Sequence, residues 1–148
     1  MEKTKTARPA KTARVKAPTQ APVAHGVGRR KSSVARVWLR RGKGALMVNG
    51  KEVNQYFDTD VTRADAASPF KICPMSADFD VDVNVNGGGL TSQAGAVRLG
   101  IARALVSLDE RVRVVLREHG MLTVDSRLKE RKKYGQKAAR RKFQFVKR

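Results

Sequence analysis

The chain has 148 residues, and 32 Lys and Arg against 13 Asp and Glu give it a formal net charge of +19. Because charge of one sign at this density disfavours a compact state unless an anion neutralises it, the composition predicts a soluble protein that binds polyanions. A single cysteine excludes an intrachain disulfide and suggests a reducing, intracellular compartment. The sequence has no run of about 18 apolar residues, the length that would predict a membrane span.

Residues 1–25 are predicted to form a disordered basic N-terminal extension. The segment holds three prolines and six Lys and Arg among scattered Ala and Thr, so it offers too little apolar surface to offset the entropy lost on ordering. An organellar transit peptide has a similar composition, but it is usually richer in Ser and lacks an early acidic residue such as Glu2. We therefore expect a plain disordered arm.

The first predicted strand is SSVARVWLRR, residues 32–41, in which apolar and polar or aromatic side chains alternate. Its inner face would carry Ala35, Val37 and Leu39, and its outer face Arg36, Trp38 and Arg40. Glycines at 42–44 predict a turn, residues 45–48 a second strand, and Asn49-Gly50 a tight turn after it.

The middle of the chain predicts short helical pieces followed by a strong strand. A short helix is expected at 51–57, and an irregular helical connection at 68–76, where two prolines stand. In DFDVDVNVN, residues 78–86, valines alternate with Asp and Asn, so one face should be buried and the other solvated.

Two helices are predicted after the glycines at 87–89. The first spans 90–108 with apolar residues at spacings of three and four, and Thr91 or Ser92 as its N-cap. The second starts at an Asp109 cap, stops at Gly120, and buries three apolar residues, Val112, Val115 and Leu116. Apolar periodicity then disappears, so we expect an α+β domain of about 100 residues with a basic arm at each end.

Two glycine-containing patterns resemble ligand-binding sites, but each can also be explained by the local fold of the chain. Asp82, Asn84, Asn86 and Gly87 match the start of a calcium loop, but Gln93 stands where a bidentate Glu is required, so a strand explains the spacing better. The glycines at 87–89 let the chain turn from strand into helix, and a backbone contact to an RNA phosphate there remains an alternative.

Catalytic and metal-binding constellations are missing from the sequence. His25 stands at the edge of the basic arm, His119 ends a predicted helix, and Cys73 has no base at recognisable spacing. We therefore expect no enzyme activity, no cofactor and no metal site.

Two basic segments, residues 26–41 and 130–148, predict a nucleic-acid interface. Cations interleaved with an aromatic ring suit phosphate pairing and base stacking, although Trp38 could instead cover the core. Gly135 interrupts any amphipathic helix near the C-terminus, and the charge there has one sign, which favours an external anion over a merely solvated tail. The predicted RNA ligands are Arg29, Arg30, Lys31, Arg36, Trp38, Arg40, Arg131, Lys132, Lys133, Tyr134, Lys137, Arg140, Arg141 and Lys142.

Three long stretches also carry a family resemblance: GVGRRKSSVARVWLRRGKGALMVNGKEVNQYF, NGGGLTSQAGAVRLGIARAL and LTVDSRLKERKKYGQKAARRKFQFVKR. Together they resemble the universal family of the ninth protein of the small ribosomal subunit, in its bacterial and organellar form. The resemblance covers residues 26–148. Phe145-Val146 stand where the family commonly has Tyr-Ser, which puts a hydroxyl contact beside the tRNA in doubt. Ser126 stands where the family commonly has Pro, which loosens one turn.

The resemblance implies a fold like the second domain of ribosomal protein five: a small, mostly antiparallel sheet packed on two helices, with a left-handed βαβ crossover. The domains would be the extension 1–25, a globular rRNA-binding domain 26–127 and an extended basic tail 128–148. It implies binding to the 3′ major domain of 16S-type rRNA and to the seventh, tenth and fourteenth proteins of the subunit head, without homo-oligomers. Lys147 and Arg148 correspond to the family's terminal Lys-Arg, which contacts P-site tRNA.

The resemblance favours a cytoplasmic ribosome over an organellar one. Two other classes compete with this interpretation. A free-standing regulatory or nucleoid-associated module would bind nucleic acid without a ribosome, and a high-salt wash of small subunits distinguishes it, because a loosely bound module would leave. A metabolite-kinase-like enzyme would need a phosphate-binding loop and an acidic base, and the sequence contains neither.

Overall fold

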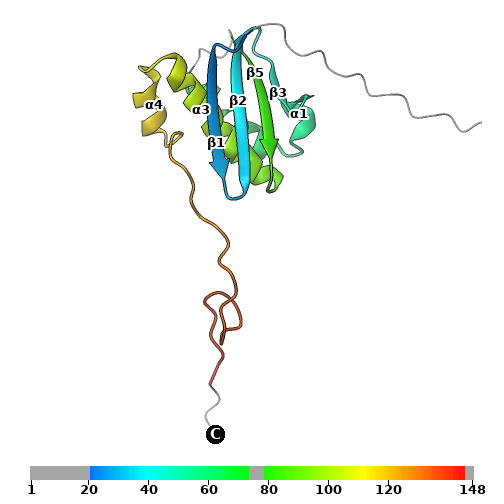
Figure 1. Cartoon of the computed structure of the whole chain (residues 1–148), viewed down its shortest axis with the longest axis vertical. Helices are drawn as coiled ribbons and strands as arrows, with labels where there is room; N and C mark the ends of the chain where they lie inside the picture. Colours follow the sequence, from blue (N-terminus) through cyan, green and yellow to red (C-terminus); the bar gives the residue numbers. More distant parts are fainter. Residues whose placement is uncertain (1–20, 74–78, 146–148) are drawn as a thin grey trace, which may run out of the picture.

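The computed structural model describes residues 21–73 and 79–145, which form one five-stranded sheet with helices packed on one of its faces (Figure 1). The predicted α+β class is confirmed. The strands are β1 (Ala24–Arg30), β2 (Ser33–Arg41), β3 (Leu46–Val48), β4 (Lys51–Glu52) and β5 (Phe79–Asn86). The helices are α1 (Val53–Tyr56), α2 (Asp60–Ile72), α3 (Leu90–Leu108) and α4 (Val112–Glu118).

The sheet has the strand order β1-β2-β5-β3-β4. Every pairing is antiparallel except that of β3 with β5, and the intervening β4, α1 and α2 supply the predicted crossover. The predicted alternation of β2 and β5 is confirmed, since their apolar residues are buried in turn. The tight turn is confirmed as well: Asn49 and Gly50 both have positive φ, and the flanking Val48 and Lys51 pair.

Strand β1 has no counterpart among the predicted elements, because the residues on its inner face are Ala24, Gly26 and Gly28. The sheet consequently begins two residues before the predicted boundary at residue 26. A Cβ atom on Gly28 would lie 2.0 Å from the carbonyl oxygen of Ala96, and one on Gly26 would lie 2.2 Å from that of Gly100. The absence of side chains therefore lets the β1 backbone lie directly on α3.

The core lies between the sheet and the helices, with α3 packed on β1 and β2 and α2 packed against α3. Leu39, Phe57, Ile101, Leu105 and Leu116 are its largest fully buried side chains. Burying one such side chain contributes about 1.5–3 kcal/mol relative to leaving it exposed. The core thus holds β1 and β2 in a fixed register and orientates their outer side chains.

The irregular connection predicted at 68–76 is in its first part the end of a longer regular helix, α2, while residues 74–76 lie outside the described residues. Helix α2 begins after Thr59, whose hydroxyl accepts from the Thr62 amide, and it continues through Pro69 to Ile72. Proline removes a helical N–H, here the donor to the carbonyl of Asp65. The Ser68 hydroxyl donates to that carbonyl at 2.7 Å instead, so the helix does not break there.

The predicted caps of the two later helices are wrong in detail. Gly89 caps α3 in an extended backbone conformation, and the Ser92 hydroxyl accepts a hydrogen bond from the Gly89 amide at 3.2 Å. Helix α4 begins at Val112, two residues after the predicted start. Val115 is 41% exposed rather than buried, because this short helix turns only the side of Leu116 towards the core.

Candidate nucleic-acid interface

The face of the sheet opposite α3 carries no described helix (Figure 1). We call it the uncovered face. Strand register places Trp38 between His25 and Asp82, and it places Arg36 between Val27 and Asn84. The side chains of β1 and β2 on this face are exposed or half-buried. A surface made of cations, amides and rings is thereby open to an external ligand.

Trp38 lies on the uncovered face and not in the core. Its ring centroid is 5.6 Å from that of His25, at an interplanar angle of 42°. Arg36 is exposed and has no ion-pair partner among residues 21–73 and 79–145. Arg40 donates to Asp82 at 3.0 Å, which balances part of its charge. The ring with its neighbouring Arg36 can stack on a base and pair with a phosphate.

The three cations at the β1–β2 turn separate into two groups. Arg29 and Lys31 are exposed and make no ion pair within the described residues. Arg30 instead donates to Asp125 at 3.3 Å and to the carbonyl oxygen of Thr91 at 3.2 Å. Its guanidinium therefore joins the turn to the first turn of α3 and to the segment that leads into the tail.

Asp125 holds that segment, which we call the tail root (residues 121–127). Its carboxylate accepts from the Arg127 guanidinium at 2.9 and 3.0 Å and from the Arg127 amide at 3.1 Å. These hydrogen bonds, then the charges of Arg127 and Arg30, hold the pKa of Asp125 well below its ordinary value. Sequence reasoning missed this residue, although an aspartate two positions before an arginine was a signal.

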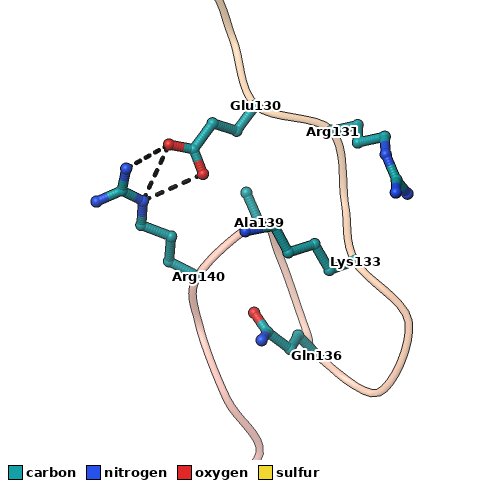
Figure 2. A pocket seen from close by; sticks show the side chains of 6 residues that line it. All are labelled: Glu130, Arg131, Lys133, Gln136, Ala139 and Arg140. Atoms are coloured by element: carbon teal, nitrogen blue, oxygen red, sulfur yellow. Dashed lines mark hydrogen bonds and ion pairs between the residues drawn. The ribbon is translucent and has the colours of Figure 1, made fainter.

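The tail beyond the root extends away from the globular body and doubles back once (Figures 1 and 2). We call residues 130–141 the tail loop. The Glu130 carboxylate accepts from Nε of Arg140 at 3.0 and 3.1 Å, and this raises the pKa of Arg140. Lys137 donates its amide to the carbonyl of Arg141, and Gly135 takes a positive φ at the bend. The predicted extended basic tail left its path open, and the Glu130–Arg140 pair closes this loop within it.

The remaining predicted ligands of the tail are exposed. Lys137 places its ammonium 5.7 Å from the Phe143 ring centroid. The others are Arg131, Lys132, Lys133, Tyr134, Arg141 and Lys142. Lys147 and Arg148 lie outside the described residues. The structure therefore brings most of the predicted cations into two regions, the uncovered face and the tail, and pairs Arg30 with Asp125, while RNA contact by each of them stays a prediction.

The alternative sites have structural explanations. The aspartate and the two asparagines of the calcium-like pattern all lie in strand β5, where Asp82 accepts from Arg40 at 3.0 Å. The Ser33 hydroxyl donates to the carbonyl of Gly87, which ties the glycine turn to β2. Within residues 21–73 and 79–145, no group of three His, Cys, Asp or Glu could hold a metal ion, and no helix is long and apolar enough to cross a membrane.

Comparison with known proteins agrees with these features. The profile of the family described as Ribosomal protein S9/S16 matches residues 28–148. The "Small ribosomal subunit protein uS9" of Cytophaga hutchinsonii is 49% identical over 126 residues, which are 85% of this chain and 98% of that protein. The protein of the same name from Chlorobaculum tepidum is 53% identical over 122 residues, 82% and 95% of the two chains. That from Borrelia duttonii is 50% identical over 123 residues, 83% and 90%.

Proposed function

The chain belongs to the Ribosomal protein S9/S16 family, and we propose that it works in the head of the small ribosomal subunit, where it binds 16S-type rRNA and P-site tRNA. Family membership confirms the resemblance found in the sequence, together with a structural and non-enzymatic role in the ribosome. The rRNA contacts, the tRNA contact and the cytoplasmic ribosome as its location are parts of the proposal.

The charge of the tail is the observation that carries the proposal. From Arg127 to Phe145 the chain has nine Lys and Arg and one acidic residue, Glu130. These residues extend away from a body that is itself basic (Figure 1). Since the body repels such a tail, an external polyanion is needed to hold it, and rRNA phosphates supply that charge at regular spacing.

The uncovered face would provide a second contact with rRNA. Exposed Arg29 and Arg36 can neutralise phosphates, and Trp38 can stack on an unpaired base. The tail extends away from the body that carries this face, so a folded RNA domain can contact both regions (Figure 1). Because the family resemblance implies the 3′ major domain of 16S-type rRNA, with the seventh, tenth and fourteenth proteins of the subunit head as neighbours, we assign that domain as the ligand of both regions.

Lys147 and Arg148 are assigned to P-site tRNA by their correspondence to the family's terminal Lys-Arg. The many cations upstream anchor the tail in rRNA, so the last two are free to meet a different ligand. A charge-assisted hydrogen bond contributes roughly 1.5–3 kcal/mol and an exposed ion contact about 1 kcal/mol or less. Removing both residues should then weaken tRNA binding by about one to a few kcal/mol.

Release of tRNA from programmed small subunits tests this assignment. Subunits that carry a chain without Lys147 and Arg148 should assemble normally and release P-site tRNA faster, by about tenfold for each 1.4 kcal/mol of weakened binding. Arg148→Lys should be milder than Arg148→Ala, because the charge remains while the planar fork is lost. Equal release rates for full-length and shortened protein across a range of salt would exclude the dipeptide as a tRNA ligand.

Association with the ribosome is tested separately by co-sedimentation with small subunits after a high-salt wash. A protein whose tail is threaded through rRNA should remain bound. A free-standing nucleic-acid-binding module would leave in the wash, because its contacts are exposed and screened by salt.

A further inference from the structure

An open cleft of about 640 Å³ lies between the C-terminal half of α3, helix α4 and the tail root. We call it the α3–α4 cleft. Three arginines, Arg103, Arg113 and Arg117, line it together with Glu110, and apolar Val106 and Leu122 are also part of its wall. Three guanidinium groups against one carboxylate leave a net charge of +2 inside the cleft. None of these residues belongs to the uncovered face or to the tail loop.

The three arginines differ in how many of their N–H groups remain free to bind a ligand. Arg113 makes an ion pair with Glu110 at 2.9 Å and a second bond to it at 3.2 Å, so these two charges largely cancel. Arg103 donates from one terminal nitrogen to the carbonyl oxygen of Val27 at 2.7 Å. Arg117 has no hydrogen-bond or ion-pair partner for its side chain anywhere in the described chain.

This arrangement suits a phosphate group. Contact with the β1 carbonyl holds Arg103 in place, so less side-chain entropy is lost when its remaining N–H groups bind an anion. Arg117 can offer both arms of its guanidinium to two phosphate oxygens. The half-buried side chains of Val106 and Leu122 give the sugar of a nucleotide an apolar surface to contact.

We propose that the α3–α4 cleft binds a phosphodiester group of the RNA backbone, with Arg103 and Arg117 as its ligands. The inference rests on the proposed rRNA-binding function and extends it to a third region. Leu122 belongs both to the cleft and to the tail root, which leads within five residues to Arg127. An RNA strand leaving the cleft would therefore meet the cations of the tail directly, and this continuity favours RNA over an acidic peptide.

Salt-dependent binding of the full-length protein to a transcript of the 16S-type 3′ major domain tests the proposal. Removing one arginine that binds a phosphate should make the slope of log K against log salt concentration shallower by about 0.7–0.9. We expect that change for Arg117→Ala and about twice as much for Arg103→Ala combined with Arg117→Ala. Arg117→Lys should restore the slope, because the charge returns, but only part of the affinity.

Arg111→Ala is the matched control, because Arg111 is an exposed arginine next to α4 that does not line the cleft. Its slope should equal that of the wild type, and circular dichroism should show every variant folded. An equal flattening by Arg111→Ala would attribute the effect to net charge and overturn the proposal. An acidic peptide as the true ligand would leave all slopes unchanged, which would also overturn it.

A competition experiment distinguishes RNA from a free anion. Inorganic phosphate, added at constant ionic strength, should leave transcript binding by the wild type unchanged. If it weakens binding by the wild type but not by Arg117→Ala, the cleft prefers free phosphate, and the RNA assignment is overturned. Failure of the wild type to bind the transcript at all would instead refute the proposed function, so the two failures are distinguishable.

Discussion

Replacing Gly28 by Ala places a methyl group between β1 and α3, where their backbones are in contact. The new Cβ would lie 2.0 Å from the carbonyl oxygen of Ala96 and 2.5 Å from the amide nitrogen of Gly100. Both are backbone atoms, so no side-chain rotation relieves the overlap. Ordinary contact begins near 3.4 Å, and the strand and helix would have to separate by about 1.4 Å.

Such overpacking typically costs about 1–3 kcal/mol. We expect a value near the upper end, about 2–3 kcal/mol, because β1 contacts α3 along its length and a local shift disturbs the neighbouring Gly26 contact as well. Reduced entropy of the unfolded chain offsets about 0.4–1 kcal/mol at most. For a domain of this size, the net destabilisation lowers the melting temperature by roughly 10 °C.

Thermal unfolding of the full-length protein, followed by far-ultraviolet circular dichroism, measures the effect. Gly89→Ser is the matched control, because Gly89 has an extended backbone with φ of −110°, a Cβ atom added there would meet no atom within 4 Å, and serine is a favoured N-cap residue. It should change stability by about 0.5 kcal/mol or less. If the Gly28→Ala and Gly89→Ser variants melt at the same temperature, the direct backbone contact between β1 and α3 does not limit the fold.

Three further predictions follow from the tail and its root. Because Asp125 has a lowered pKa, Asp125→Asn should reduce the stability measured by urea unfolding near neutral pH. The difference in stability from wild type should shrink as the pH falls below 3.8, and a constant difference down to strong acid would contradict this. Limited trypsin digestion should cleave the exposed tail well before Arg98, which makes an ion pair with Asp65 at 2.7 Å, and early cleavage at Arg98 would argue against a stable core. Three exposed cations of the tail loop, Arg131, Lys132 and Lys133, can be replaced jointly by Ala. The slope of log K for rRNA binding against log salt concentration should then become shallower by about two to three units, and an unchanged slope would show that these residues do not contact phosphates.

The predictable parts of the fold are those in which apolar side chains repeat with a regular period. Valines at every second position indicated β5, and apolar residues at spacings of three and four indicated α3. Strand β1 has no such signal, because Gly26 and Gly28 contribute no side chain to a pattern. Their role depends on α3, which lies about 70 residues further along the chain.

The same contrast applies to the candidate interface. The sequence by itself determined that the chain is basic, that its last segment carries charge of one sign, and which family it resembles. Net charge is a sum over residues and a motif is a run of consecutive residues, so neither depends on how the chain folds. Only the tertiary structure decided which cations have partners. Arg30 meets Asp125 across 95 residues and Arg140 meets Glu130 across 10, and neither pair lies within one helix or strand whose period could have indicated it. The α3–α4 cleft likewise exists only because packing brings Arg103 and Arg117 together from two helices.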